Sequence, residues 1–319
     1  MLLAITLQLV LPLILVASLR FLPARGVMDL VVRAVGTAAV VLALYLAALW
    51  TVLPGWLPWM YALAWLWSVV AQTRRLATHP QEAGRRLVPA WVSKSTFLAL
   101  TLVGLSLSII ALRGRGLPDV DTVDIRLPFQ EGRFLVVNGG STELINAHMK
   151  TLDDSVARFH AFRGQSYGVD LVRVNRWGLR ADGLLPSDPA RYVIYGTKVF
   201  APCTGVVVSA RGDRPDMPVP QMDLEVFEGN HVLIRCDDFE LLLAHFQPGT
   251  VTAKTGDLVQ SGDLLGLVGN SGRTGEPHLH CSAQRTGSSS EPYSGDPLFL
   301  TINGHVPARN DYIDAVPHD

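Results

Sequence analysis

The chain has 319 residues with 27 basic and 28 acidic side chains, so its nearly neutral charge offers no basic surface for nucleic acid. Its mean hydropathy of +0.27 is too high for an ordinary soluble protein. The apolar excess lies before residue 113. The composition therefore predicts a membrane region followed by a soluble region, with room for about two domains.

Four apolar runs are long enough, or nearly so, to cross a bilayer, which takes about 20 residues. They lie at approximately residues 2–19, 34–53, 55–71 and 95–112, and the third is the weakest. The first run lacks the basic start and the cleavage site of a signal peptide, which is the minor alternative. A buried core helix is the alternative for one run, but not for four in succession. We expect a membrane domain of about four transmembrane helices at residues 1–113.

Basic residues between the runs predict the orientation. They lie in the first and third connections, whereas the second connection carries no charge. These residues are Arg20, Arg25, Arg33, Arg74, Arg75, Arg85, Arg86 and Lys94. The positive-inside rule places both connections in the cytoplasm, against the opposing Arg113 and Arg115. We therefore expect an integral membrane protein of the inner or cytoplasmic membrane. Its linker (114–125) and domain (126–319) would face the periplasm or exterior.

Short β-rich runs separated by turns predict a mostly β, antiparallel soluble domain. The expected strands are 133–137, 168–174, 205–210, 231–236, 240–246, 264–269 and 278–283. Residues 143–158 could hold one helix, and 211–221 form a loop of a length that is usually functional or mobile. Glycines at 256–266 predict a hairpin like that of lipoyl or biotinyl carriers. No Met-Lys acceptor lies at its tip, which disfavours a carrier domain.

Three cysteines, Cys203, Cys236 and Cys281, lie in the soluble half. An oxidising compartment permits one disulfide and leaves one thiol. The sequence leaves the pairing open. Cys203 with Cys236 is the favoured pair, and free buried thiols are about equally compatible.

His278 and His280 form a His-x-His pair on an extended segment. Because side chains alternate along a strand, the two imidazoles point to one face while Leu279 points to the other. This spacing can aim both rings at one metal ion. Two satisfied surface histidines are the alternative.

Four further segments precede this motif in a consistent order and carry a family resemblance. The matching segments are 167–170, 196–207, 229–234, 243–245 and 262–280. Residues 165–285 resemble the lysostaphin-type, LytM-like zinc endopeptidases of peptidase family M23, which cut peptide cross-links in bacterial cell walls. The resemblance implies a barrel-sandwich-type antiparallel fold, zinc as the cofactor and peptidoglycan peptide as the substrate.

The resemblance also implies roles for individual residues. Asp170 and His280 correspond to metal ligands of the family. His278 and His245 correspond to histidines that act on water and on the developing oxyanion. A zinc ion with three protein ligands and an open position lowers the pKa of bound water to about 7, which makes hydroxide available at neutral pH.

One position departs from the family pattern, because Ser166 stands where the family has its first histidine ligand. A serine hydroxyl is a poor zinc ligand compared with imidazole. His148, in an Asn-x-His segment, and His160 could supply the missing ligand. The segments 146–148 and 165–170 resemble a variant of the family with such an arrangement. The alternative for either histidine is a surface or linker position.

Three functions follow from these features. The first is a membrane-anchored zinc metalloendopeptidase acting on peptidoglycan cross-link peptides. The second is a catalytically degenerate domain that binds cell wall or regulates another hydrolase, as the serine at position 166 suggests. The third, a transporter or sensor, is disfavoured because only Arg33, near an end, places charge in a span. Arg163 and Arg273 flank the expected groove and could bind a substrate carboxylate; solvated surface charges are the alternative.

Overall fold

A computed structural model describes residues 5–78, 89–286 and 291–316. The chain divides into two compact units, Met1–Leu112 and Arg113–Asp319. The start of the first expected span, together with Arg85 and Arg86, lies outside the described residues.

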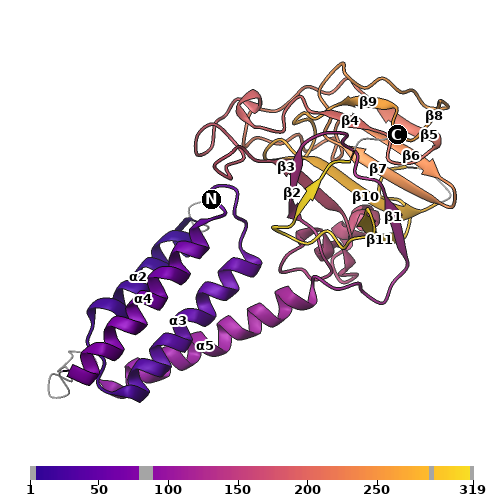
Figure 1. The fold of residues 1–319 in the computed structure, drawn as a ribbon. Helices are drawn as coiled ribbons and strands as arrows, with labels where there is room; N and C mark the ends of the chain where they lie inside the picture. The colour runs from indigo at the N-terminus through magenta and orange to yellow at the C-terminus, as the bar shows by residue number, and fades with distance from the viewer. Residues whose placement is uncertain (1–4, 79–88, 287–290, 317–319) are drawn as a thin grey trace. The chain divides into compact units, whose positions relative to one another are not determined.

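The described residues of the first unit form four α-helices, and a short π-helical segment leads into the first of them. Figure 1 shows how these helices follow one another along the chain. The elements are η1 Thr6–Val10, α2 Leu11–Phe21, α3 Val27–Ala47, α4 Leu57–Thr78 and α5 Ala90–Arg113. Among the described residues, α3 and α5 are long and apolar enough to cross a membrane. The segment Thr6–Phe21 is apolar but shorter. Polar side chains near the end of α4, including Gln72, Arg74 and Arg75, reduce its hydropathy. Length and composition thus support two of the four expected spans.

Small residues allow α3 and α5 to pack closely. A Cβ atom at Gly104 of α5 would lie only 2.6 Å from the carbonyl carbon of Ala39 in α3. Helices in membranes commonly approach through such small residues, because lipid gives no hydrophobic drive for their association. A larger side chain at position 104 would force the two helices apart.

Arg33, the charged residue expected near the end of a span, is buried inside this unit. Arg33 donates hydrogen bonds to the carbonyl oxygens of Ser18 and Leu22 at the end of α2, the second at 3.1 Å. Its guanidinium also lies 3.7 Å from the carboxylate of Asp29. Arg33 therefore stabilises the C-terminal end of a helix, where free carbonyl groups favour a cation.

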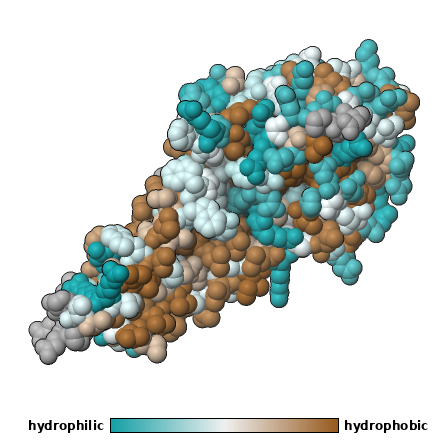
Figure 2. Space-filling model, viewed as in Figure 1, coloured by the Kyte–Doolittle hydropathy of each residue, from teal (hydrophilic) through white to brown (hydrophobic). Residues whose placement is uncertain are grey.

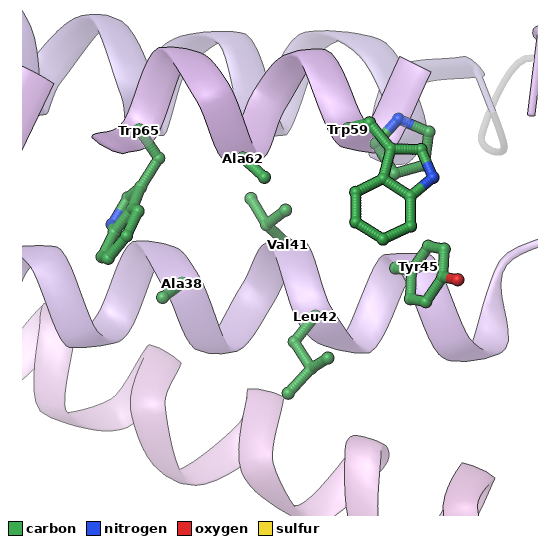
Figure 3. Close-up of a pocket in the computed structure, with 8 residues that line it drawn as sticks. Ala38, Val41, Leu42, Tyr45, Trp59, Ala62 and Trp65 are labelled. Carbon is green, nitrogen blue, oxygen red and sulfur yellow. The ribbon is translucent and has the colours of Figure 1, made fainter. Parts of the chain in front are cut away.

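Helices α3 and α4 enclose an apolar groove of about 300 Å³ (Figure 3). The residues that line it are Ala38, Val41, Leu42, Tyr45, Pro58, Trp59, Ala62 and Trp65. The rings of Tyr45 and Trp59 meet edge to face with their centroids 5.4 Å apart. Figure 2 shows apolar side chains over much of the visible face of this unit.

The second unit is built on a sheet in which most strands pair antiparallel (Figure 1). The order is β12-β2-β3-β10-β7-β6-β5-β8; β11 pairs with β10 and, in parallel, with β1, while β4 and β9 form a separate pair. The strands are β1 Thr122–Ile125, β2 Arg133–Asn138, β3 Val169–Arg173, β4 Lys198–Phe200, β5 Gly205–Arg211, β6 His231–Cys236, β7 Phe239–Ala244, β8 Leu258–Val259, β9 Leu264–Leu267, β10 Leu279–Arg285, β11 Pro297–Ile302 and β12 Tyr312–Asp314. The mostly antiparallel fold predicted for this half is confirmed.

Two local predictions are wrong. Residues 143–158 form no α-helix; two 3₁₀ segments, η3 Ala147–Leu152 and η4 Ala157–Gln165, occupy this region, and a third, η5, spans Pro189–Arg191. Residues 256–266 do not form a hairpin, because β8 pairs with β5 and β9 pairs with β4. The pairing partners of β8 and β9 lie elsewhere in the chain, whereas in the first case a local cap at Asn146 replaces the expected helix.

The core of the unit lies against one face of the sheet. Leu279, Cys281 and Ala283 of β10 all belong to this core. Because side chains alternate, the intervening His280 projects from the opposite face. The structure pairs Cys203 with Cys236 in a disulfide, the favoured pairing, and leaves Cys281 as a free buried thiol.

Candidate metal centre

Strands β3 and β10 bring the first two site residues together. Asp170 and His280 lie opposite each other in the antiparallel register. Nδ1 of His280 donates a hydrogen bond to Oδ1 of Asp170 at 2.8 Å. A shift of one residue in this register would move one side chain to the other face, so the core pattern of β10 fixes the contact.

His148 reaches the same carboxylate from the 3₁₀ segment η3. Its Nε2 donates to Oδ2 of Asp170 at 2.9 Å. The side chain of Asn146 holds this loop in place, because it donates to the carbonyl oxygens of Gly140 and Gly168 and accepts from the backbone N–H of His148. The Asn-x-His pattern thus has a structural cause: the asparagine fastens the loop to the start of β3.

His160, the other candidate for the missing ligand, is not brought to the site. Its ring nitrogen Nε2 lies 3.0 Å from the carbonyl oxygen of Asp154, and its side chain is exposed. His160 therefore lies at the surface, which is the alternative that the sequence left open for it.

Ser166 is fully buried and does not face the Asp170 carboxylate as a ligand would. Its hydroxyl donates to the carbonyl oxygen of Arg163 at 2.6 Å and lies 2.8 Å from the hydroxyl of Thr151. Thr151 in turn donates to the carbonyl oxygen of His148 at 2.7 Å. The serine therefore anchors the segment that carries the histidine.

The three potential ligands form a compact set. One donor atom from each of His148, Asp170 and His280 lies within 4.8 Å of the other two. Two imidazoles and one carboxylate form a donor set of the kind that catalytic zinc uses. In addition, Nε2 of His280 is buried without a hydrogen-bond partner among the described residues. A buried polar atom in this state commonly marks an ion or water site, so the residues present fit a zinc ion.

Two further histidines line the site and share one tautomer. Nδ1 of His278 lies 2.8 Å from the carbonyl oxygen of Glu276, and Nδ1 of His245 lies 2.8 Å from that of Ser271. Because a carbonyl oxygen only accepts, Nδ1 carries the proton in each ring and Nε2 is left with a lone pair when the ring is neutral. Nε2 of His278 lies 3.6 Å from Oδ1 of Asp170. Both rings can therefore take a proton near the carboxylate.

His245 also has a strained backbone. Its φ of 72° lies in the left-handed region, which a residue with a side chain rarely adopts. The ring centroids of His245 and His278 are 4.8 Å apart. Burial, with the neighbouring His278 and His280, holds the pKa of His245 well below its ordinary value. The ring is therefore neutral at neutral pH, and strain of this kind clusters at functional sites.

The charges of the ligand set suit metal binding near neutral pH. Burial alone would raise the pKa of Asp170, but His148 and His278 and two histidine hydrogen bonds hold it well below its ordinary value. Burial lowers the pKa of His280 to about 4. An ionised carboxylate and a neutral imidazole are the forms that bind metal.

Two supporting residues were missed by the sequence reasoning. Asn138, at the end of β2, donates to Oδ2 of Asp170 at 2.8 Å, and Arg309 donates to the side-chain oxygen of Asn138 at 2.9 Å. Such outer contacts orient a metal-binding carboxylate. No sequence motif marks either residue as functional. A prediction that β2 pairs with β3 could have identified Asn138 as a neighbour of Asp170.

Comparison with known proteins gives the family of this unit. Residues 192–292 match the model of peptidase family M23. The second unit contains a peptidase family M23 domain. The match includes His245, His278 and His280 of this M23 domain, whereas Asp170, Ser166 and His148 precede it. The resemblance inferred from the sequence is confirmed. No curated protein matches the chain.

Solved structures similar to the M23 domain share little sequence with it. The catalytic domain of the prophage-encoded M23 protein EnpA from Enterococcus faecalis, as a point mutant, is 22% identical, with coverage of 41% of this chain and 72% of that one and a TM-score of 0.27. The catalytic domain of lysostaphin from Staphylococcus simulans is 22% identical, with coverage of 39% and 70% and a TM-score of 0.26. A complex of SpoIIIAH and SpoIIQ gives 16% identity, coverage of 55% and 95%, and a TM-score of 0.30. We rest the family on the sequence match, since these TM-scores are low.

Proposed function

We propose that this chain is a membrane-anchored zinc metalloendopeptidase that hydrolyses cross-link peptides of peptidoglycan. The observation that carries the proposal is the meeting of His148, Asp170 and His280, in which an upstream histidine supplies the ligand that the serine at position 166 cannot. The M23 match supports the peptidase chemistry and its cell-wall substrate class. In this proposal α2 to α5 anchor the chain through about four spans, with the M23 domain on the outer side.

The side chains divide the work of hydrolysis. His148, Asp170 and His280 would hold zinc, which supplies Lewis-acid activation of a water molecule. His278, with its bare Nε2 near Asp170, takes a proton from the attacking water as general base. His245 lies beside it with the same free nitrogen. The imidazolium that forms when His278 takes this proton donates a hydrogen bond to the negative charge on the substrate oxygen and then passes the proton to the leaving amine nitrogen.

Zinc content of the purified full chain tests the proposal, with His148→Ala and His160→Ala as a matched pair. We expect one zinc ion per parent chain and per His160→Ala chain, with chelator-sensitive hydrolysis of cross-linked muropeptides by both. His148→Ala removes one of the three ligands. Loss of an outer contact typically lowers metal affinity about 10- to 100-fold, so loss of a ligand should lower it more.

Two outcomes would contradict it. A folded parent chain that binds no zinc when metal is in excess would favour the degenerate alternative, a domain that binds or regulates without cleaving. Equal zinc in the parent and in His148→Ala would exclude His148 as a ligand.

A further inference from the structure

A cavity of about 510 Å³ in the second unit has no role in the reaction as described. Its lining includes two arginines, three phenylalanines and a buried glutamine: Arg158, Phe159, Phe162, Gln165, Phe227 and Arg273. One wall comes from η4 and the other from the segments before β6 and before β10. The cavity is therefore built from loops that the sheet brings together.

The cavity borders the metal centre on both walls. Thr151 lines it and donates a hydrogen bond to the carbonyl oxygen of His148. On the other wall, Arg273 immediately precedes Thr274, whose hydroxyl lies 3.1 Å from Nδ1 of His278. Each wall of the cavity is thus joined to a histidine of the site, one through a hydrogen bond of Thr151 and the other through the neighbour of Arg273 in the chain.

The aromatic floor continues toward the ligands. The ring of Phe227 lies 4.2 Å from that of Phe162 and 5.7 Å from that of Tyr293, measured between centroids. Tyr293 lies 6.2 Å from His280. Tyr293 and His280 are buried, so the rings of Phe162 and Phe227 are the part of this series that lines the cavity and can contact an apolar portion of a substrate.

Both arginines are exposed, and each guanidinium lies over an aromatic ring. The guanidinium of Arg158 lies 5.1 Å from the ring centroid of Phe159, and that of Arg273 lies 5.0 Å from the ring centroid of Phe227. A guanidinium placed over a ring keeps the N–H groups at its edge available for a second partner. The aromatic rings thus prepare the arginines for binding without neutralising them.

Neither guanidinium forms an ion pair with a carboxylate in the described part of the chain, whereas the nearby Arg163 pairs with Asp154. Of the two arginines that the sequence placed beside the groove, Arg163 is therefore committed to its own chain and Arg273 is available. Arg158 is the second available arginine in the cavity. A carboxylate is a group that guanidinium groups recognise well, through charge-assisted and bidentate hydrogen bonds.

We propose that this cavity is a substrate subsite that binds a free carboxylate carried by the peptide next to an apolar group. The inference rests on the proposed peptidase function. It adds that the substrate carries a negatively charged group near the bond that is cut. Arg158 and Arg273 bind the carboxylate, and Phe162 and Phe227 contact the adjoining carbon chain.

The test measures binding, so that it does not depend on turnover. A fluorescent peptidoglycan stem peptide with free carboxylates and its fully amidated counterpart are titrated with the full chain in detergent and chelator. We expect the parent to bind the free acid about tenfold or more tightly than the amide, the effect of hydrogen bonds to a charged group. Arg158→Gln combined with Arg273→Gln should remove that preference. Arg126→Gln, an exposed arginine outside the cavity, should keep it.

Equal binding of the two peptides by the parent would overturn the subsite, as would a double variant that retains the preference. Failure of the subsite and failure of the peptidase are separable by zinc content and hydrolysis in the parent. A parent that prefers the free acid but holds no zinc supports the subsite and contradicts the peptidase. A parent that cleaves both peptides but binds them with equal affinity supports the peptidase and contradicts the subsite.

Discussion

Ser166 is buried at the position where the family resemblance expects a histidine ligand. Its hydroxyl lies 2.8 Å from that of Thr151, which donates to the backbone carbonyl oxygen of His148. A histidine at position 166 would need that buried space, and the loop that carries His148 would lose its anchor. We interpret Ser166 and His148 as one coupled replacement. The segment before β3 no longer carries the histidine ligand, and an upstream loop supplies it instead.

His278→Ala should abolish most hydrolysis while zinc stays bound. The imidazole accepts a proton from the attacking water, and general bases of this kind typically contribute about 10²- to 10⁴-fold to the rate. Hydrolysis of a muropeptide, measured beside zinc content, checks the prediction. His305→Ala serves as the matched control, because His305 is exposed outside the site. A His278→Ala chain that cleaves at the parent's rate would remove the proposed base.

The sequence was sufficient for residues that share one regular strand. Alternation along the strand could predict that His278 and His280 share one face, whereas Asp170 was placed beside them by the family resemblance alone, because the pairing of β3 with β10 is not local. His148 could only be named as a candidate, since its approach depends on Asn146 bonding to Gly140 and Gly168. That contact exists only after the loop has packed against the sheet.

At the scale of elements, residues 143–158 show why a helix prediction failed. Asn146 has an extended backbone, with φ of −135°, and its side chain accepts the N–H of His148. An asparagine that bonds to nearby backbone in this way competes with helix formation. The extended Asp153 and Val156 interrupt the segment again. The result is two short 3₁₀ turns, and this irregularity is what aims His148 at β3.

Acid should destabilise the sheet around β10. His280 is buried with its pKa lowered to about 4, and the pKa of His245 is also lowered. An unfolded histidine has a pKa of about 6.5, so the unfolded chain binds more protons between these values. The stability is therefore fully present above about pH 6.5 and is lost progressively as the pH falls toward 4. Asp170 adds little in this window, because an unfolded aspartate has a pKa of about 3.9 and the folded pKa of Asp170 lies lower still.

Thermal unfolding of the chelated full chain, followed by near-ultraviolet circular dichroism from neutral to acid pH, checks this expectation. The melting temperature should fall less steeply with acidification in His280→Leu than in the parent. His305→Ala should follow the parent. The same pH dependence in the parent and in His280→Leu would show that this histidine is not the group that senses acid.

At the scale of the whole molecule, the number of spans does not change the expected side of the M23 domain. Two spans, α3 and α5, or all four place the connection between α4 and α5 on one side and the M23 domain on the other. Arg74 and Arg75 at the end of α4 favour the cytoplasm for that connection. The disulfide between Cys203 and Cys236 agrees with an oxidising compartment for the domain.

Alkaline phosphatase fusions test this orientation, because the enzyme is active only where its own disulfides form. A fusion after residue 319 should be active, and one in the connection between α4 and α5 should be inactive. An inactive C-terminal fusion together with an active one in the connection would reverse the orientation and exclude an outer cell-wall substrate.

The contact of Arg309 with Asn138 also bears on when the carboxylate of Asp170 becomes supported during synthesis. Arg309 lies 171 residues after Asn138, the side chain that orients Asp170. At about 5 to 20 residues per second, a ribosome takes roughly 10 to 30 s to make that stretch. A nascent chain that already exposes Asp170 outside the membrane therefore has to wait for Arg309 before its carboxylate is fully supported. For the proposed peptidase, we expect this delay to keep its activity silent until synthesis has passed Arg309.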